Sequence, residues 1–152
     1  MATYHSAADV LARVLTDAGL GSTVDSTGTP AGSWPVYATH EPDEPDSCVT
    51  IYNTDGYGGV RDFITRKVGG MDGFQVRVRA ATHTLAHDKI QAIYDYLSET
   101  LYNLGISIDS KYYVVHSCEL FGNVIDLGKE SPNSQRSIVV FNAQVQINDR
   151  TP

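Results

Sequence analysis

Apolar residues recur at helical spacing near the start of the chain. Ser6 stands where an N-cap residue is favoured, and Asp9 three positions later is a weaker form of the capping box. Gly19 follows where a helix commonly ends. The pattern predicts a helix over residues 6–18 with one buried face. Its apolar positions are Ala7, Val10, Leu11, Val14, Leu15 and Ala18.

A longer helical stripe begins in the middle of the sequence. Thr82 or Thr84 can cap its start and Gly105 its end, so we expect about twenty residues, roughly 30 Å, of helix. Such a helix is long enough to cover several strands. The residues that share its face are Ala86, Ile90, Ile93, Tyr94, Leu97, Leu101 and Leu104.

Other stretches alternate with a period of two, which is typical of strands with one buried face. Residues 74–80 and 136–147 alternate most regularly, and 48–52 is rich in β-branched and aromatic residues. Weaker strand patterns cover 34–38, 106–109, 111–121 and 124–128. The order predicts an α+β fold in one domain, residues 1–152, with a mainly antiparallel or mixed β-sheet flanked by two helices.

Composition narrows the class of protein. The 152 residues are 41% hydrophobic and 19% charged, which is usual for a globular domain, and the formal charge is −7. An acidic chain of this kind is not expected to bind nucleic acid over its whole surface. We find no apolar run of the roughly 20 residues that span a membrane, and no secretory signal at the N-terminus.

Two polar segments interrupt the pattern. Residues 53–73 contain six glycines together with Arg61, Arg66 and Lys67, and a loop of this length in a compact domain is usually functional or disordered. Residues 41–46 are acidic and contain two prolines, so we expect a solvated loop there.

Signals for catalysis and metal binding are weak. Cys48 and Cys118 are expected to be buried free thiols in a reducing compartment, and a disulfide is the alternative, for which their spacing gives no support. No CxxC pair exists that could ligate a structural zinc ion. His83 and His87 lie four apart on a helix and could hold a metal ion, yet no third ligand stands out. Neither GxSxG nor a phosphate-binding glycine loop is present. We therefore predict no catalytic residues, no metal and no cofactor.

The strand at 74–80 places Gln75, Arg77 and Arg79 on its polar face. This stripe is either a solvated strand surface or a positive patch that faces an acidic protein partner or nucleic acid. Head-to-tail contacts between copies close into a ring when the rotation permits.

Several segments together resemble the tail terminator, or minor capsid, protein family of long-tailed bacteriophages. The resemblance rests on an N-terminal helix, the strand end Val49–Gly56, the strand Phe74–Arg79 and the helical motif Ile93-Tyr94-Asp95-Tyr96-Leu97. It covers roughly residues 6–104, and residues 106–136 depart from the pattern.

The resemblance implies a structural virion protein without enzymatic activity. Such proteins form a ring, expected to be hexameric, that caps the head-proximal end of the tail tube, stops its polymerisation and offers a joining surface to the head completion or connector protein. They are assembled in the host cytoplasm, and DNA passes through the lumen without being specifically bound.

The resemblance assigns this role to two sets of residues. The stripe Gln75, Arg77 and Arg79 would face a neighbouring subunit or the lumen. The loop that would contact the tube or a neighbouring subunit contributes Asp55, Tyr57, Arg61, Phe63, Arg66 and Lys67.

Three alternative functions stay open. They are a head–tail adaptor or stopper, a small intracellular binding module, and a metal-dependent enzyme that uses His83 and His87.

Overall fold

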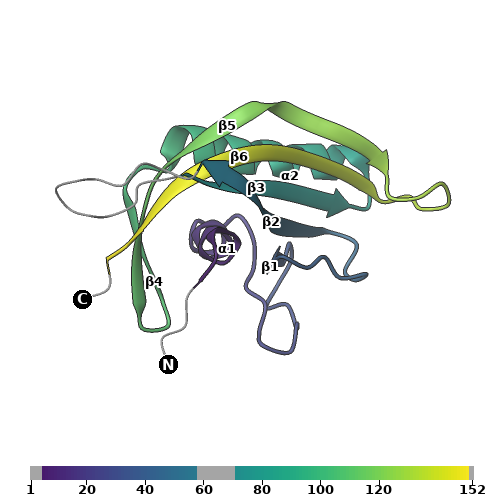
Figure 1. The fold of residues 1–152 in the computed structure, drawn as a ribbon. Helices are drawn as coiled ribbons and strands as arrows, with labels where there is room; N and C mark the ends of the chain where they lie inside the picture. The colour runs from purple at the N-terminus through teal and green to yellow at the C-terminus, as the bar shows by residue number, and fades with distance from the viewer. Residues whose placement is uncertain (1–4, 58–70, 151–152) are drawn as a thin grey trace.

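The computed structural model describes residues 5–57 and 71–150. Two helices and a π-helical turn accompany one curved sheet (Figure 1). In chain order the elements are α1 (Ala7–Asp17), β1 (Val36–Ala38), β2 (Cys48–Tyr57), β3 (Met71–Ala80), α2 (His83–Asp95), η1 (Tyr96–Thr100), β4 (Leu104–Ile108), β5 (Lys111–Lys129) and β6 (Ser137–Asp149).

The sheet is six-stranded, with the order β1-β2-β3-β6-β5-β4. β1 runs parallel to β2, and every other pair of neighbours is antiparallel. The sheet curls over α1, which lies beneath it in Figure 1. The predicted α+β fold with a mixed, mainly antiparallel sheet is therefore confirmed.

Both helices pack on the same face of the sheet. On β3 the fully buried Phe74, Val76 and Val78 alternate with less buried polar residues, and Val76 lies opposite Phe141 of β6. The Phe141 ring meets the Tyr94 ring of α2 edge to face at 5.4 Å. The apolar stripe of α1 joins the same core cluster. We call this helix-covered side the inner face and the opposite side the outer face.

The predicted first helix is confirmed, and its start shows the cap. The Ser6 hydroxyl accepts from the Asp9 amide at 3.3 Å, and the Asp9 carboxylate accepts from the Ser6 amide at 2.9 Å. This reciprocal pairing satisfies amides that have no partner within the helix. The apolar stripe then places Val10, Leu11 and Val14 in the core.

The second helix is shorter than predicted. It begins as expected, with the Thr82 hydroxyl accepting from the Leu85 amide, but α2 and η1 end at Thr100. Gly105 does not cap it, because Leu104 and Gly105 belong to β4 and pair with Val115 and Val114. The apolar spacing continues past the helix end because β4 also faces the core.

The predicted loop at 53–73 is also shorter at both ends. Residues 53–57 extend β2 and residues 71–73 begin β3, and these two ends pair with each other. These residues are strands because they pair with each other in the folded sheet, although their glycine-rich sequence has a low intrinsic preference for strand. The weakly predicted strands at 111–121 and 124–128 form one continuous strand, β5, in which shifts of register break the alternation.

The two described ends of the chain meet at the β4–β5 hairpin. His5 Nδ1 lies 2.9 Å from the Tyr113 hydroxyl, and His5 Nε2 lies 3.2 Å from the Asp109 carboxylate. The amide of Arg150 donates to the Tyr112 carbonyl at 2.8 Å. The described residues at both ends, His5 and Arg150, are therefore held at the same corner of the molecule.

Candidate functional site

The root of the predicted contact loop lies where β2 and β3 end together. Their pairing continues to Tyr57 opposite Met71, across a shift of register after Thr54. A side chain at Gly73 would collide with the Asp55 carbonyl, so the two strands approach closely here. Asp55 is exposed beside this root. Of the other predicted loop residues, Tyr57 ends β2, whereas Arg61, Phe63, Arg66 and Lys67 lie outside the described residues.

The polar stripe of β3 lies on the outer face, as its alternation predicts. Gln75 is half-buried and its Nε2 donates to the Asn142 side chain at 3.0 Å. Arg77 is also half-buried, and its Nε lies 3.0 Å from Glu41 Oε2. Both side chains retain partial access to solvent, so their predicted contact with a neighbour stays a prediction.

Arg79 is buried, and the expectation that it presents a charge on the surface is wrong. Its side chain is 1% exposed and its guanidinium donates to the main-chain carbonyls of Asp43 at 3.2 Å and Pro45 at 2.7 Å. Its Nη1 also lies 3.3 Å from Glu41 and 3.5 Å from Glu130. Residues 41–46 cover the arginine, which the alternation of β3 alone does not reveal.

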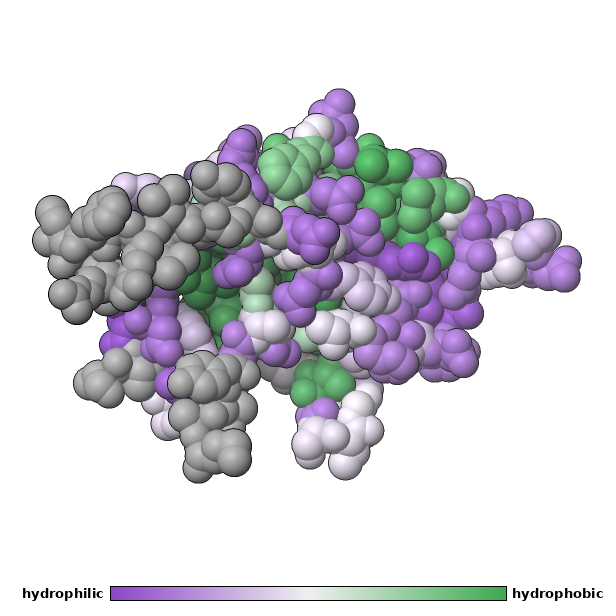
Figure 2. All heavy atoms as spheres, viewed as in Figure 1, coloured by the Kyte–Doolittle hydropathy of each residue, from purple (hydrophilic) through white to green (hydrophobic). Residues whose placement is uncertain are grey.

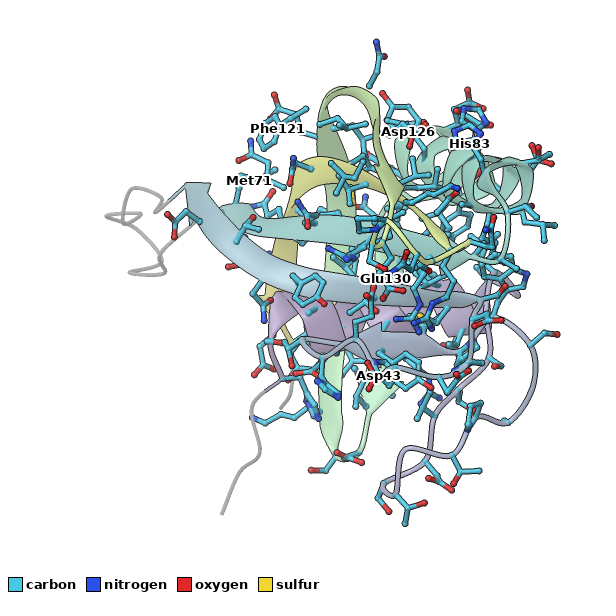
Figure 3. All side chains as sticks on the ribbon, turned by 90° about the vertical axis from the view of Figure 1, so that its right-hand side faces the viewer. Asp43, Met71, His83, Phe121, Asp126 and Glu130 are labelled. Carbon is cyan, nitrogen blue, oxygen red and sulfur yellow. The ribbon has the colours of Figure 1, made fainter. Side chains whose placement is uncertain are left out.

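Arg136 completes this group of charges, which we call the arginine cluster: Arg77, Arg79, Arg136, Glu41 and Glu130. Arg136 Nε lies 2.6 Å from Glu130 Oε2, and Arg136 Nη1 lies 3.5 Å from Asp46 and also donates to the Asp43 carbonyl. Figure 3 shows Asp43 and Glu130 close together beside the sheet. The cluster joins β3, the segment 41–46 and the β5–β6 turn, so its role is to hold the fold.

Sequence reasoning missed the arginine cluster as a unit. It treated residues 41–46 as a solvated loop, whereas the Glu41 side chain is only 10% exposed. The charges of the sequence could have indicated it. Residues 41–46 are acidic and Arg77 and Arg79 are basic, and carboxylates form strong hydrogen-bonded pairs with arginine.

A second feature that the sequence did not reveal is apolar. Phe121, Ile125 and Leu127 of β5 are 47%, 46% and 53% exposed. Figure 2 shows hydrophobic side chains gathered over β5 on the face seen in Figure 1. We call these three residues the outer strip. Local alternation could not place them, because shifts of register separate Phe121 from Ile125 and Asp126 from Gly128.

The paired histidines make a contact within the chain. The rings of His83 and His87 stack with centroids 5.9 Å apart, and His83 Nε2 lies 2.7 Å from Asp126 Oδ2. Figure 3 places His83 and Asp126 together, on the side of β5 away from Phe121. Among the described residues, no group of three or more His, Cys, Asp or Glu side chains could hold a metal ion.

Both cysteines are free thiols, as predicted. Cys48 is fully buried and Cys118 is half-buried. Burial raises the pKa of the Cys48 thiol to about 11 and that of Cys118 to about 12, which makes either a poor nucleophile at neutral pH. Within residues 5–57 and 71–150, no helix has the length and apolar character needed to cross a membrane.

Comparison with known proteins gives a family. The family model described as bacteriophage tail terminator protein matches residues 14–149. A solved structure titled as the virion of a native gene transfer agent particle contains a chain that is 10% identical, with a TM-score of 0.48. The match covers 74% of the present chain and 77% of the other. None of the curated proteins matches.

Proposed function

Because the chain belongs to the bacteriophage tail terminator family, whose members are structural proteins of the virion tail, we propose that it caps the head-proximal end of the tail tube as a ring. The ring stops polymerisation of the tube and provides the surface on which the head completion or connector protein docks. The ring is expected to be hexameric and to be assembled in the host cytoplasm, with DNA passing through its lumen.

The family match itself carries this proposal. It runs from Val14, near the end of α1, to Asp149, the last residue of β6, so it includes the last turn of α1, all of α2 and the whole sheet. An assembly role also fits the chemistry of the described residues, which offer a rigid scaffold and surface patches. The closely spaced charged side chains of the arginine cluster form ion pairs with one another, and these ion pairs hold the fold together.

We assign contact with the tube or with a neighbouring subunit to the segment from Asp55 to Gly73. β2 and β3 pair as far as Tyr57 and Met71, so this segment leaves and re-enters the sheet at one end. Within it, residues 61–67 carry three basic side chains and one acidic one, so this stretch is net positive in an otherwise acidic chain and suits an acidic surface on the partner. The side chains proposed to make the contact are Asp55, Tyr57, Arg61, Phe63, Arg66 and Lys67.

Gln75 and Arg77 are the members of the stripe that we retain for contact with a neighbour or the lumen. Both lie on the outer face, which no helix of the described residues covers. Arg79 is left out because its guanidinium is used within the chain.

The test is the length of tail tubes assembled with and without the chain. Tube protein is polymerised in vitro, the chain is added, and the lengths and ends of tubes are measured by electron microscopy. Tubes should stay short and carry a ring of extra density at one end. Unchanged lengths with bare ends would contradict the proposal, and binding to the isolated head connector without binding to tubes would identify a head–tail adaptor instead.

A further inference from the structure

The link between η1 and β4 holds an exposed tyrosine on a fixed backbone. Leu101 is buried, and its amide donates to the Tyr96 carbonyl at 3.0 Å in a π-helical turn. Asn103 has a φ of 47°, its amide donates to the His116 carbonyl at 2.8 Å, and its side chain contacts the His116 ring. Tyr102 between them is 75% exposed.

Asn103 adopts the left-handed conformation, which asparagine tolerates better than most residues, and π-helical turns are frequent at functional sites. Anchors on both sides order the backbone of Tyr102 before any partner binds. A tyrosine presented in this way is suited to be the buried anchor of an interface.

Phe121 and Ile125 of the outer strip lie on the outer face of the sheet. Phe121 lies opposite Asn142 and Ile125 opposite Val140, whereas Phe141 between them points to α2. The first two strip residues therefore point away from the helices. Tyr102 lies between η1 and β4, on the side of the sheet that carries the helices. Tyr102 and the outer strip of the same chain therefore do not contact each other.

The edge of β5 is unsuited to accept another strand. Shifts of register interrupt it, the Tyr94 hydroxyl donates to the Gly122 carbonyl at 2.9 Å, and the Gly128 amide donates to Asp126 at 2.8 Å. Bulges and side-chain caps of this kind blunt a sheet edge against pairing. A partner must therefore dock on the side chains of the outer strip.

We propose that Tyr102 of one copy packs on the outer strip of the next copy, head to tail. A head-to-tail contact needs two different surfaces on the same chain, and Tyr102 and the outer strip are such a pair. Each copy carries a formal charge of −7, so copies must meet where charge is low. The strip is apolar, and the carboxylate beside it, Asp126, is already paired with His83. Glu119 lies on the same face as Phe121 and accepts from the Gln144 side chain at 2.6 Å, which leaves its other carboxylate oxygen to accept from the tyrosine hydroxyl.

The inference rests on the proposed ring, and its test is a mixing experiment. Tyr102→Asp and Ile125→Asp change exposed side chains, so both variants should fold, which circular dichroism and thermal melting verify. Self-association is measured by analytical ultracentrifugation over a range of concentrations. Each variant alone should associate at least tenfold more weakly than the wild-type chain. An equimolar mixture should form a dimer and nothing larger, because only one intact contact can form between the two.

Leu85→Asp is the matched control, since Leu85 is 48% exposed on α2 and belongs to neither surface. It should associate like the wild-type chain. Wild-type association of both test variants, or the absence of a mixed dimer, would overturn this contact while leaving the ring itself in place. A wild-type chain that stays monomeric even on tube ends would overturn the ring and the contact together.

Discussion

Arg79 of β3 and Glu41 meet through Nη1 and Oε1 at 3.3 Å, although 38 positions separate them in the sequence. The contact closes residues 41–46 over the outer face, which is the side of the sheet opposite α1 and α2. An arginine buried in this way must have every N–H group satisfied, and main-chain carbonyls of Asp43, Pro45 and Asp46 supply most of the acceptors. The pair therefore marks where the fold depends on one charged side chain.

Replacing Arg79 with methionine should destabilise the protein by about 3–5 kcal/mol, because Glu41 and three carbonyls lose their buried donor. Urea denaturation followed by circular dichroism measures the change. Arg13→Met is the control, since Arg13 forms an exposed pair with Asp17 and its loss should cost at most about 0.5 kcal/mol. Equal effects of the two substitutions would show that the burial of Arg79 contributes nothing.

Gly73→Ala should destabilise the root of the contact loop by about 1–3 kcal/mol. The added methyl group would collide with the main chain of Asp55, 2.7 Å from its carbonyl carbon, so the strands must separate. Gly32→Ala is the matched control, because its methyl group meets only Ser22 at 3.5 Å. It should leave stability unchanged or raise it by up to about 1 kcal/mol. Thermal melting of both variants checks the comparison.

The two thiols should resist alkylation in the folded protein at pH 8. Their raised pKa values, about 11 for Cys48 and about 12 for Cys118, leave almost no thiolate, and Cys48 is in addition fully buried. Iodoacetamide labelling followed by mass spectrometry should show modification only after unfolding. Rapid labelling of the native protein would contradict the expected burial.

Stability should also fall as the pH rises above about 9. Thiols of the unfolded chain ionise there, whereas the folded thiols keep their protons until about 11 and about 12. The stabilising contribution is therefore complete below pH 9 and is lost above it. Urea denaturation at pH 8 and pH 10 should show a smaller loss in the Cys48→Ala, Cys118→Ala double variant.

Reversing the charge of Arg61, Arg66 and Lys67 to glutamate should abolish capping of tail tubes without changing the melting temperature. The reason is that the substitutions take the net charge of residues 55–73, where three aspartates balance the three basic side chains, from zero to −6 in a chain that is already acidic. Lys129→Glu, an exposed charge at the end of β5, is the control and should cap normally. Normal capping by the triple variant would remove the loop from the contact.

Elements set by local sequence were predictable. The first helix follows from its cap and stripe, and β3 follows from strict alternation, so their positions are close to those expected. Where the sequence misled, a distant partner decided the structure. Leu104 continues the helical spacing of α2 but pairs with Val115 in the sheet.

The candidate site shows the same limit. The outer-face placement of Gln75 and Arg77 followed from period two, but the burial of Arg79 required knowing that residues 41–46 return to cover it. The exposure of the outer strip could not be predicted from the sequence. Shifts of register in β5 interrupt the alternation that would otherwise indicate which face of the sheet Ile125 lies on. Tyr102 gave no signal at all, since an aromatic residue next to Leu101 fits the expected helix.

The meeting of His5 and Arg150 at the β4–β5 hairpin has a practical value. An affinity tag or fluorescent reporter attached directly before His5 or after Arg150 would leave the described fold from that corner, whereas Ile125 and Leu127 lie near the other end of β5. His5 and Arg150 are held on neighbouring residues of one strand, Tyr113 and Tyr112, so a short linker can join them. A circular permutant opened within residues 131–135 would carry its label at the other end of the sheet, so one pair of molecules could report distances from both sides of an assembled particle.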